Sequence, residues 1–87
     1  MYTVVWLEQG HVFNVHCFDD VNDAVNECMK LNEEANKFNL HYNWHYNVVD
    51  EQHKLFNVRK HILKHEGALT GPCADYINRF RQKAIQH

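Results

Sequence analysis

The side chains in this sequence that could do chemistry are histidines, cysteines and aromatic rings, and many of them gather in one stretch. Residues 41–47 read HYNWHYN, with the same three residues on each side of a tryptophan. Such a stretch could bind a metal ion, stack on bases, or form a β-strand with its polar side in water. On a strand His41 and His45 would lie roughly 13 Å apart, which is too far to share one ion.

A second group of potential metal ligands lies nearer the C-terminus. His61 and His65 would approach each other if residues 60–66 formed a helical turn, and Cys73 could come near them. The spacing fixes no third ligand, whereas zinc sites have characteristic ligand spacings. We therefore predict no metal and no cofactor, and we interpret the histidines as surface residues that can respond to mild acid.

Cys73 raises the question of covalent catalysis, because the dipole at the start of a helix can lower the pKa of a thiol. The alternative is a small apolar residue in the core, where unpaired cysteines usually lie. The sequence places no general base or oxyanion donors beside it. Signatures of serine hydrolases, P-loop enzymes, zinc proteases and dinucleotide-binding enzymes are absent. We predict that the protein is not an enzyme.

The N-terminal residues have the pattern of a β-hairpin. Residues 2–8 and 12–18 are rich in β-branched and aromatic side chains and flank the sequence QGH. Gly10 can supply the positive φ that a tight turn requires. Two antiparallel strands are therefore expected here.

Two segments have the period of an amphipathic helix. Between residues 20 and 38 apolar side chains recur every three or four positions, and Asp19 or Asp20 can serve as the N-cap. The second helix is expected to begin at Pro72, because proline is favoured at the first helical position. Its apolar stripe is formed by Cys73, Tyr76, Ile77, Phe80 and Ala84.

The segment between these helices alternates rings with polar residues, which is the period of a strand. Residues 51–66 are ambiguous, because Asp50 before them and Gly67 after them are also typical of a capped helix. An internal similarity favours a hairpin: VVWLEQGHVFNV and VVDEQHKLFNV share VV, EQ and FNV in the same order. Strands are therefore predicted near residues 41–49 and 54–59.

The order ββαββα predicts an α+β fold in a single domain of residues 1–87, with a four-stranded antiparallel sheet and two helices on one face. Strand alternation also divides the side chains between two faces. The predicted core face consists of Val5, Leu7, Phe13, Val15, Tyr42, Trp44, Tyr46, Val48, Phe56 and Val58. The predicted outer face consists of Tyr2, Val4, Trp6, Asn14, His16, Asn43, His45, Asn47, Asn57 and Arg59.

Two surfaces are candidates for binding a partner. The outer sheet face is rich in rings and amides and poor in charge, as interface cores are, although antiparallel sheets also commonly leave one face in water. The outer face of the first helix is acidic, which could dock on a basic protein or simply be solvated. The candidate partner-binding residues are Asp20, Asp23, Glu27, Glu34, Trp6, Tyr2, His16, His45, Asn47 and Arg59.

Charge is distributed unevenly along the chain. Residues 1–53 carry two lysines against nine acids, a net charge of −7, while residues 54–87 carry seven basic residues against two acids, a net charge of +5. This uneven charge affects which partners the protein can bind, because opposite charges steer association. It is also consistent with a homodimer in which the acidic half of one copy meets the basic half of another.

The sequence contains no apolar run of 18 residues and no segment with the pattern of a secretory signal. Cys17, Cys28 and Cys73 are an odd number without the spacing of a redox pair, which suits reduced thiols. We therefore expect a cytoplasmic protein with no membrane partner.

In general form the chain resembles the small inhibitors that bacteriophages direct against host machinery, of the anti-CRISPR or anti-restriction type. The resemblance is carried by a small single-domain frame from Met1, a hairpin followed by the acidic helix CFDDVNDAVNECMKLNEE, and the absence of catalytic motifs. It includes no family motif and assigns no role to an individual residue. The resemblance implies a protein partner in the host cytoplasm, such as a nucleic-acid-handling complex.

The leading hypothesis is therefore a non-enzymatic protein-binding module that inhibits such a complex. The alternative is a single-stranded RNA or DNA binder that stacks bases on Tyr2, Trp6, His16 and His45 and holds the backbone through Arg59 and the basic half. The acidity of the chain favours the first hypothesis, because neutralisation of phosphates supplies most nonspecific affinity for nucleic acid.

Overall fold

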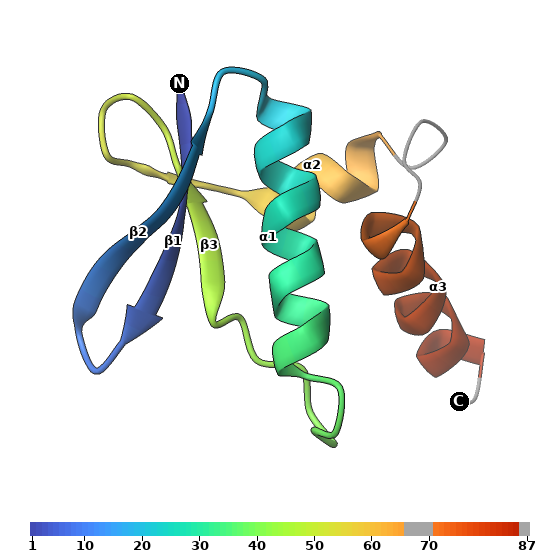
Figure 1. The fold of residues 1–87 in the computed structure, drawn as a ribbon. Coiled ribbons are helices and arrows are strands. Elements are labelled where there is room, and N and C mark those ends of the chain that lie inside the picture. The colour runs from blue at the N-terminus through green and yellow to red at the C-terminus, as the bar shows by residue number, and fades with distance from the viewer. Residues whose placement is uncertain (66–70, 86–87) are drawn as a thin grey trace.

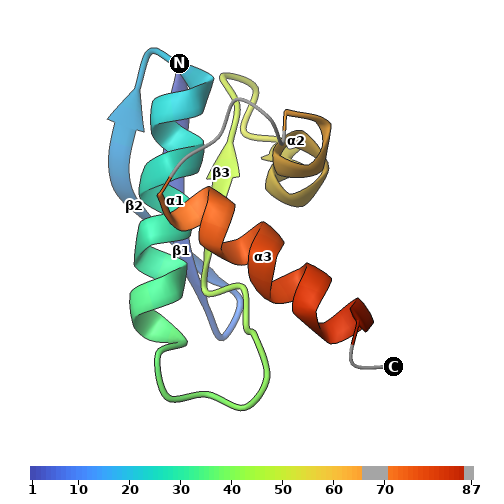
Figure 2. The same ribbon diagram turned by 90° about the vertical axis from the view of Figure 1, so that its right-hand side faces the viewer.

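A computed structural model describes residues 1–65 and 71–85, with the backbone alone for residues 80–85. Its four strands form one antiparallel sheet in the order β2-β1-β3-β4, so the predicted α+β fold is confirmed. Three helices, rather than the predicted two, lie on the same side of this sheet (Figure 1, Figure 2). The elements are β1 (Tyr2–Glu8), β2 (His11–Phe18), α1 (Val21–Ala35), β3 (Tyr46–Val49), β4 (Leu55–Phe56), α2 (Val58–Lys64) and α3 (Pro72–Ile85).

Strands β1 and β2 form the predicted hairpin. Gln9 and Gly10 turn the chain with φ of 48° and 81°, and Glu8 pairs with His11 across the turn. Two successive positive φ angles are typical of the tight turns that match the twist of a hairpin. The pairing shifts between Val4 and Val5, where β2 carries an additional residue, Val15, in a β-bulge.

Helix α1 begins where the sequence predicts it to begin. The Asp20 side chain is the N-cap and accepts a hydrogen bond from the Asn22 amide at 2.7 Å. The helix ends at Ala35, before the predicted residue 38, with Asn36 as its C-cap. Phe38 therefore lies beyond the helix and is 90% exposed, although its spacing had placed it on the buried stripe.

The predicted strand at residues 41–49 is shorter than expected, because β3 begins only at Tyr46. Two buried asparagines, Asn32 in α1 and its C-cap Asn36, bind the backbone that precedes β3. The Asn36 amide donates to the Asn43 carbonyl and accepts from the Asn43 N–H, each at 2.8 Å. Asn32 makes the same pair of bonds to Tyr46, at 2.9 and 2.8 Å. Side chains of the helix thus satisfy backbone groups that a neighbouring strand would otherwise satisfy.

Residues 50–64 contain both a hairpin strand and a capped helix, the two alternatives that the sequence suggested. β3 and β4 form a second hairpin in which Val48 pairs with Phe56, as the internal similarity predicts. The predicted strand to residue 59 is wrong, because Asn57 caps α2 by accepting a hydrogen bond from the Lys60 amide at 2.9 Å. A cap of this kind favours helix over a continued strand.

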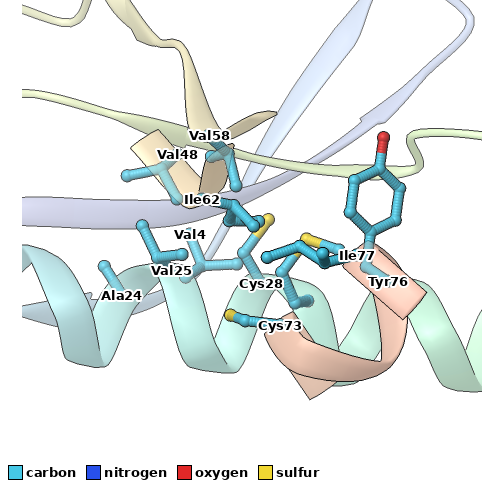
Figure 3. Close-up of a cluster of buried hydrophobic side chains, with 11 residues drawn as sticks. Val4, Ala24, Val25, Cys28, Val48, Val58, Ile62, Cys73, Tyr76 and Ile77 are labelled. Atoms are coloured by element: carbon cyan, nitrogen blue, oxygen red, sulfur yellow. The ribbon is translucent and has the colours of Figure 1, made fainter. Parts of the chain in front are cut away.

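The core lies between the sheet and the three helices (Figure 3). Its buried members are Val4, Ala24, Val25, Cys28, Met29, Val48, Val58, Ile62, Cys73, Tyr76 and Ile77. This confirms the expected stripe of α3 as far as Ile77, while the Phe80 and Ala84 side chains lie outside the described residues. Tyr42, Trp44, Tyr46 and Phe56 pack partly buried against the core, as predicted.

The predicted faces of β1 are reversed. Val4 pairs with Val48 and Trp6 pairs with Tyr46, which puts Tyr2, Val4 and Trp6 on the helix side. Val5 is buried as well, on the opposite side of the strand. The sequence YTVVWLE is apolar on both faces, so alternation alone could not select the side that meets the helices.

The predicted core positions of β2 are also wrong. Phe13 and Val15 are 51% and 47% exposed. β2 is an edge strand, and Val15 occupies the bulge, so neither side chain packs into the core between the sheet and the helices.

Candidate functional site

A row of aromatic rings crosses three strands on the helix side of the sheet. Trp6 lies between Tyr46 and Phe13, with ring centroids at 6.1 and 6.3 Å, and His11 continues the row 6.2 Å beyond Phe13. The tryptophan and the phenylalanine are 40% and 51% exposed. We call Tyr46, Trp6, Phe13 and His11 the aromatic row.

The row is held by backbone pairing from both sides. Trp6 pairs with Phe13 in β2 and with Tyr46 in β3, so regular strand geometry places the three rings side by side. The backbone of Tyr46 is fixed in turn by Asn32 of α1. Exposed rings on such a scaffold lose little conformational freedom when a partner binds.

Further exposed apolar side chains lie at the same end of the molecule. The turn of the first hairpin and the connection between α1 and β3 lie at one end in both views (Figure 1, Figure 2). That connection carries Phe38 and Leu40, which are 90% and 93% exposed. These two side chains add exposed apolar surface to the connection between α1 and β3.

The predicted outer sheet face is not one surface in the structure. Trp6 belongs to the aromatic row, while Tyr2 packs partly buried against the core with its ring 5.7 Å from that of Phe56. His16 pairs with Val4 at the edge of the sheet, on the helix side. Asn47 pairs with Val5 and shares the opposite face.

Two other predicted residues lie outside the strands. His45 is half-buried in the connection before β3, and its carbonyl accepts a hydrogen bond from the Leu7 amide at 3.0 Å. Arg59 is an exposed residue in the first turn of α2. The residues chosen for base stacking are therefore dispersed over several surfaces.

The acidic residues of α1 remain together on the helix surface. Asp23 and Glu34 are exposed and Glu27 is half-buried, whereas Asp20 is engaged as the N-cap. Glu33 lies to one side and forms an ion pair with Arg79 of α3 at 2.7 Å. The acidic surface thus consists of Asp23, Glu27 and Glu34, with the exposed Lys30 between the two glutamates, and the Glu33–Arg79 ion pair joins the acidic half of the chain to the basic half.

The buried cysteines have the environment of core residues. Burial raises the pKa of the Cys73 thiol to about 11, and the thiol donates a hydrogen bond to the Asn26 side chain at 3.2 Å. Burial and the neighbouring Cys73 raise the pKa of Cys28 to about 12. Desolvation thus outweighs the helix dipole, so neither thiol ionises at neutral pH to become a nucleophile.

His61 and His65 approach each other as the helical spacing predicts, with ring centroids 4.5 Å apart. Within the described ranges, no three side chains of the types that bind metals converge on one point. Burial, with smaller contributions from His65 and Lys64, lowers the pKa of His61. Its Nε2 lies 3.0 Å from the Asn22 amide oxygen.

A shallow hollow of about 360 Å³ lies where β4 meets α2. Trp44, Asn47, Asn57 and Arg59 are among its lining residues. It combines a ring, two amides and a guanidinium group, and these groups can contact the base and phosphate of a nucleotide.

None of the helices in the described part of the chain is long and apolar enough to cross a bilayer. Comparisons with models of protein families, with curated proteins and with solved structures find no match.

Five residues of this site were missed by reasoning from sequence. Phe13 and Tyr46 were assigned to the core, His11 was assigned to the hairpin turn, and the roles of Asn32 and Asn36 were not recognised. A signal for the asparagines was present, because amides four residues apart continue the apolar stripe of Cys28 in α1. A polar group at a buried position requires a hydrogen-bond partner, which here is the backbone of the following segment.

Proposed function

We propose that the protein is a non-enzymatic protein-binding module of the cytoplasm that contacts its partner through the aromatic row. The observation that carries the proposal is the exposure of Trp6 and Phe13, at 40% and 51%, on strands whose pairing holds both rings in place. Aromatic residues dominate the energetics of protein interfaces, and rigid rings contribute contact area at low entropic cost.

The acidic surface of α1 supports a basic partner. Complementary charge accelerates encounter and excludes wrong partners, while buried rings supply most of the affinity. Proteins that bind nucleic acid carry basic surfaces, which are complementary in charge to the acidic surface of α1. We therefore propose that the partner is a nucleic-acid-handling complex of the host and that binding inhibits it, as the resemblance to bacteriophage inhibitors implies.

The test is affinity capture from a bacterial lysate with and without nuclease, read by mass spectrometry. The unmodified protein is compared with Trp6→Ala and with Leu63→Ala, which removes a similarly exposed apolar side chain (42%) from α2. We expect some host proteins to remain bound after nuclease treatment. These proteins should be captured by the unmodified protein and by L63A, but not by W6A. Recovery only of nucleic acid, or equal recovery with W6A, would contradict the proposal.

A second candidate function is binding of single-stranded nucleic acid, which the hollow beside Arg59 favours. In that case binding to a labelled oligonucleotide would fall steeply with salt and would weaken on Arg59→Gln. Trp6→Ala would leave it unchanged, because Trp6 does not line the hollow. Fluorescence anisotropy at two salt concentrations separates the two functions.

A further inference from the structure

The outer edge of β2 carries backbone groups that no other strand of the described sheet pairs with. The Leu7 amide donates to the His45 carbonyl, so in β1 it points towards β3 and the amide of Trp6 points towards β2. The backbone N–H and C=O groups of Phe13, which pairs with Trp6, therefore point towards β1. By alternation, and with the bulge taken into account, the N–H and C=O groups of Val12, Asn14 and Cys17 point outward.

This edge has one of the features that limit pairing with other chains, the bulge at Val15, but it lacks the others. Natural edge strands are short, carry lysine or proline, or contain a bulge. β2 is eight residues long and contains no lysine, arginine, aspartate, glutamate or proline. Val12, Phe13 and Val15 are 59%, 51% and 47% exposed along it. The opposite edge strand, β4, has only two residues.

We infer that β2 pairs antiparallel with β2 of a second copy of this chain. In a two-fold contact each surface meets itself, so a charged surface would repel its own copy. The acidic surface of α1 is excluded by this argument, whereas β2 is free of acidic and strongly basic side chains. The inference rests on the backbone edge and its lack of charge, and it stands independently of the proposed function.

The bulge indicates a register for the pairing. With the two-fold axis at Asn14, Val12 lies opposite Cys17 of the partner subunit, because the bulged Val15 adds no step along the edge. Both residues direct their backbone groups outward, as a hydrogen-bonded pair requires. Asp19 of each copy is then displaced from its counterpart by about 26 Å along the strand, at about 3.3 Å per residue, so the flanking acids do not meet.

The pairing would extend the sheet from four strands to eight, with the helices of both copies on the same side. Phe13 and His11 lie on that side of β2, so the aromatic rows of the two copies would become neighbours across the new contact. A partner with two equivalent sites would then bind with higher avidity than a single row allows.

Sedimentation velocity over a range of concentrations, up to the millimolar, tests the pairing. We expect a dimer that added salt does not weaken, whereas a contact between acidic and basic halves would weaken with salt. Val12→Lys should weaken dimerisation by at least about tenfold, because it places a charge on the contact. The matched control is Leu55→Lys, a 66% exposed residue on the same face at the other edge, which should have no effect.

Disulfide trapping tests the register with the folded protein. Paired residues of antiparallel strands have Cα atoms about 5.5 Å apart, within the range of a disulfide. Val12→Cys should therefore form covalent dimers with the native Cys17 under mild oxidation, while Leu55→Cys and the unmodified protein should not. A monomer at every concentration, or equal trapping of V12C and L55C, would overturn the inference.

Discussion

The two hairpins of this protein contain the same tripeptide, FNV, and use it in different ways. In the first hairpin Phe13 and Asn14 continue β2, Val15 forms a bulge, and the strand runs on to Phe18. In the second, Phe56 ends β4 and Asn57 caps α2, whose first residue is Val58. The same three side chains thus lie in an exposed edge strand in one hairpin and at a strand-to-helix junction in the other.

The difference follows from what surrounds each copy. β1 is long enough to pair with β2 along its whole length, and residues beyond Val15 remain apolar and aromatic. After Val58 the chain carries Arg59, Lys60 and an apolar spacing that suits a helix, so the asparagine becomes a cap. The second hairpin packs Val48 and Phe56 into or against the core, whereas the first exposes the rings of Trp6 and Phe13. We interpret the first hairpin as the binding surface and the second as its support.

The largest expected effect is that of Asn32→Ala, which removes the support of β3. It deletes both hydrogen bonds to the Tyr46 backbone, leaving the Tyr46 N–H without this partner and its carbonyl with the long bond from the Cys28 thiol, which should lower the free energy of unfolding by about 2–4 kcal/mol. Urea denaturation measures the change. Asn39→Ala is the control, because that exposed side chain makes only weaker contacts and should cost under about 0.5 kcal/mol. Equal effects would refute the role of Asn32.

The turn of the first hairpin should be next in sensitivity. Gly10 has φ of 81° with open space around the position of a β-carbon, so Gly10→Ala should cost about 1–2 kcal/mol through backbone strain alone. His53 has φ of 60° in the second hairpin without being glycine. His53→Gly should therefore be neutral or stabilising in thermal unfolding, and a loss as large as that of G10A would contradict this explanation.

The two asparagines of the FNV tripeptides compare the hairpins directly. Asn57→Ala should lower stability by about 1 kcal/mol, because it removes the N-cap of α2. Asn14→Ala lies on the exposed edge and should change stability by less than about 0.5 kcal/mol. Chemical denaturation of both variants under the same conditions measures this difference in stability. If N14A cost as much as N57A, the edge strand would have a structural role that its exposure does not indicate.

The smallest expected effect concerns pH. The pKa of His61 is lowered in the folded protein, chiefly by burial, so below the ordinary value near 6.5 the unfolded chain binds the proton more readily. Stability should therefore fall as pH decreases through and below 6.5. His61→Gln should lose less stability than the unmodified protein between pH 7.5 and pH 5, as measured by thermal unfolding. A parallel decline in both would show that His61 does not contribute.

Sequence patterns predict the order of most elements because local signals agree with the fold. The Gly10 turn, the Asp20 cap and the Pro72 helix start each depend on a few neighbouring residues. The side of β1 that meets the helices could not be predicted, because Val4 and Val5 are equally apolar. The loss of strand at residues 41–45 depends on hydrogen bonds from Asn32 and Asn36 to the backbone of residues 7 to 14 positions further on, which no local pattern indicates.

Only part of the aromatic row was predicted, because alternation along a strand does not show which of its faces meets the helices. Trp6 was recognised as a candidate contact, but it was assigned to the outer face of the sheet, where Asn47 does lie, and not to the helix side. Phe13 was missed because an apolar residue on an alternating strand is normally assigned to the core. Only the order of strands in the sheet shows that β2 is an edge with exposed rings.

The roles of the two hairpins are best distinguished by comparing Phe13→Ala with Asn57→Ala, each assayed for stability and for capture of proteins from a nuclease-treated bacterial lysate. Phe13 is exposed in the first hairpin, and Asn57 caps α2 after the second. We predict that F13A remains nearly as stable as the unmodified protein but loses the captured proteins, while N57A is less stable and retains them. Capture by F13A at the unmodified level would contradict the central claim.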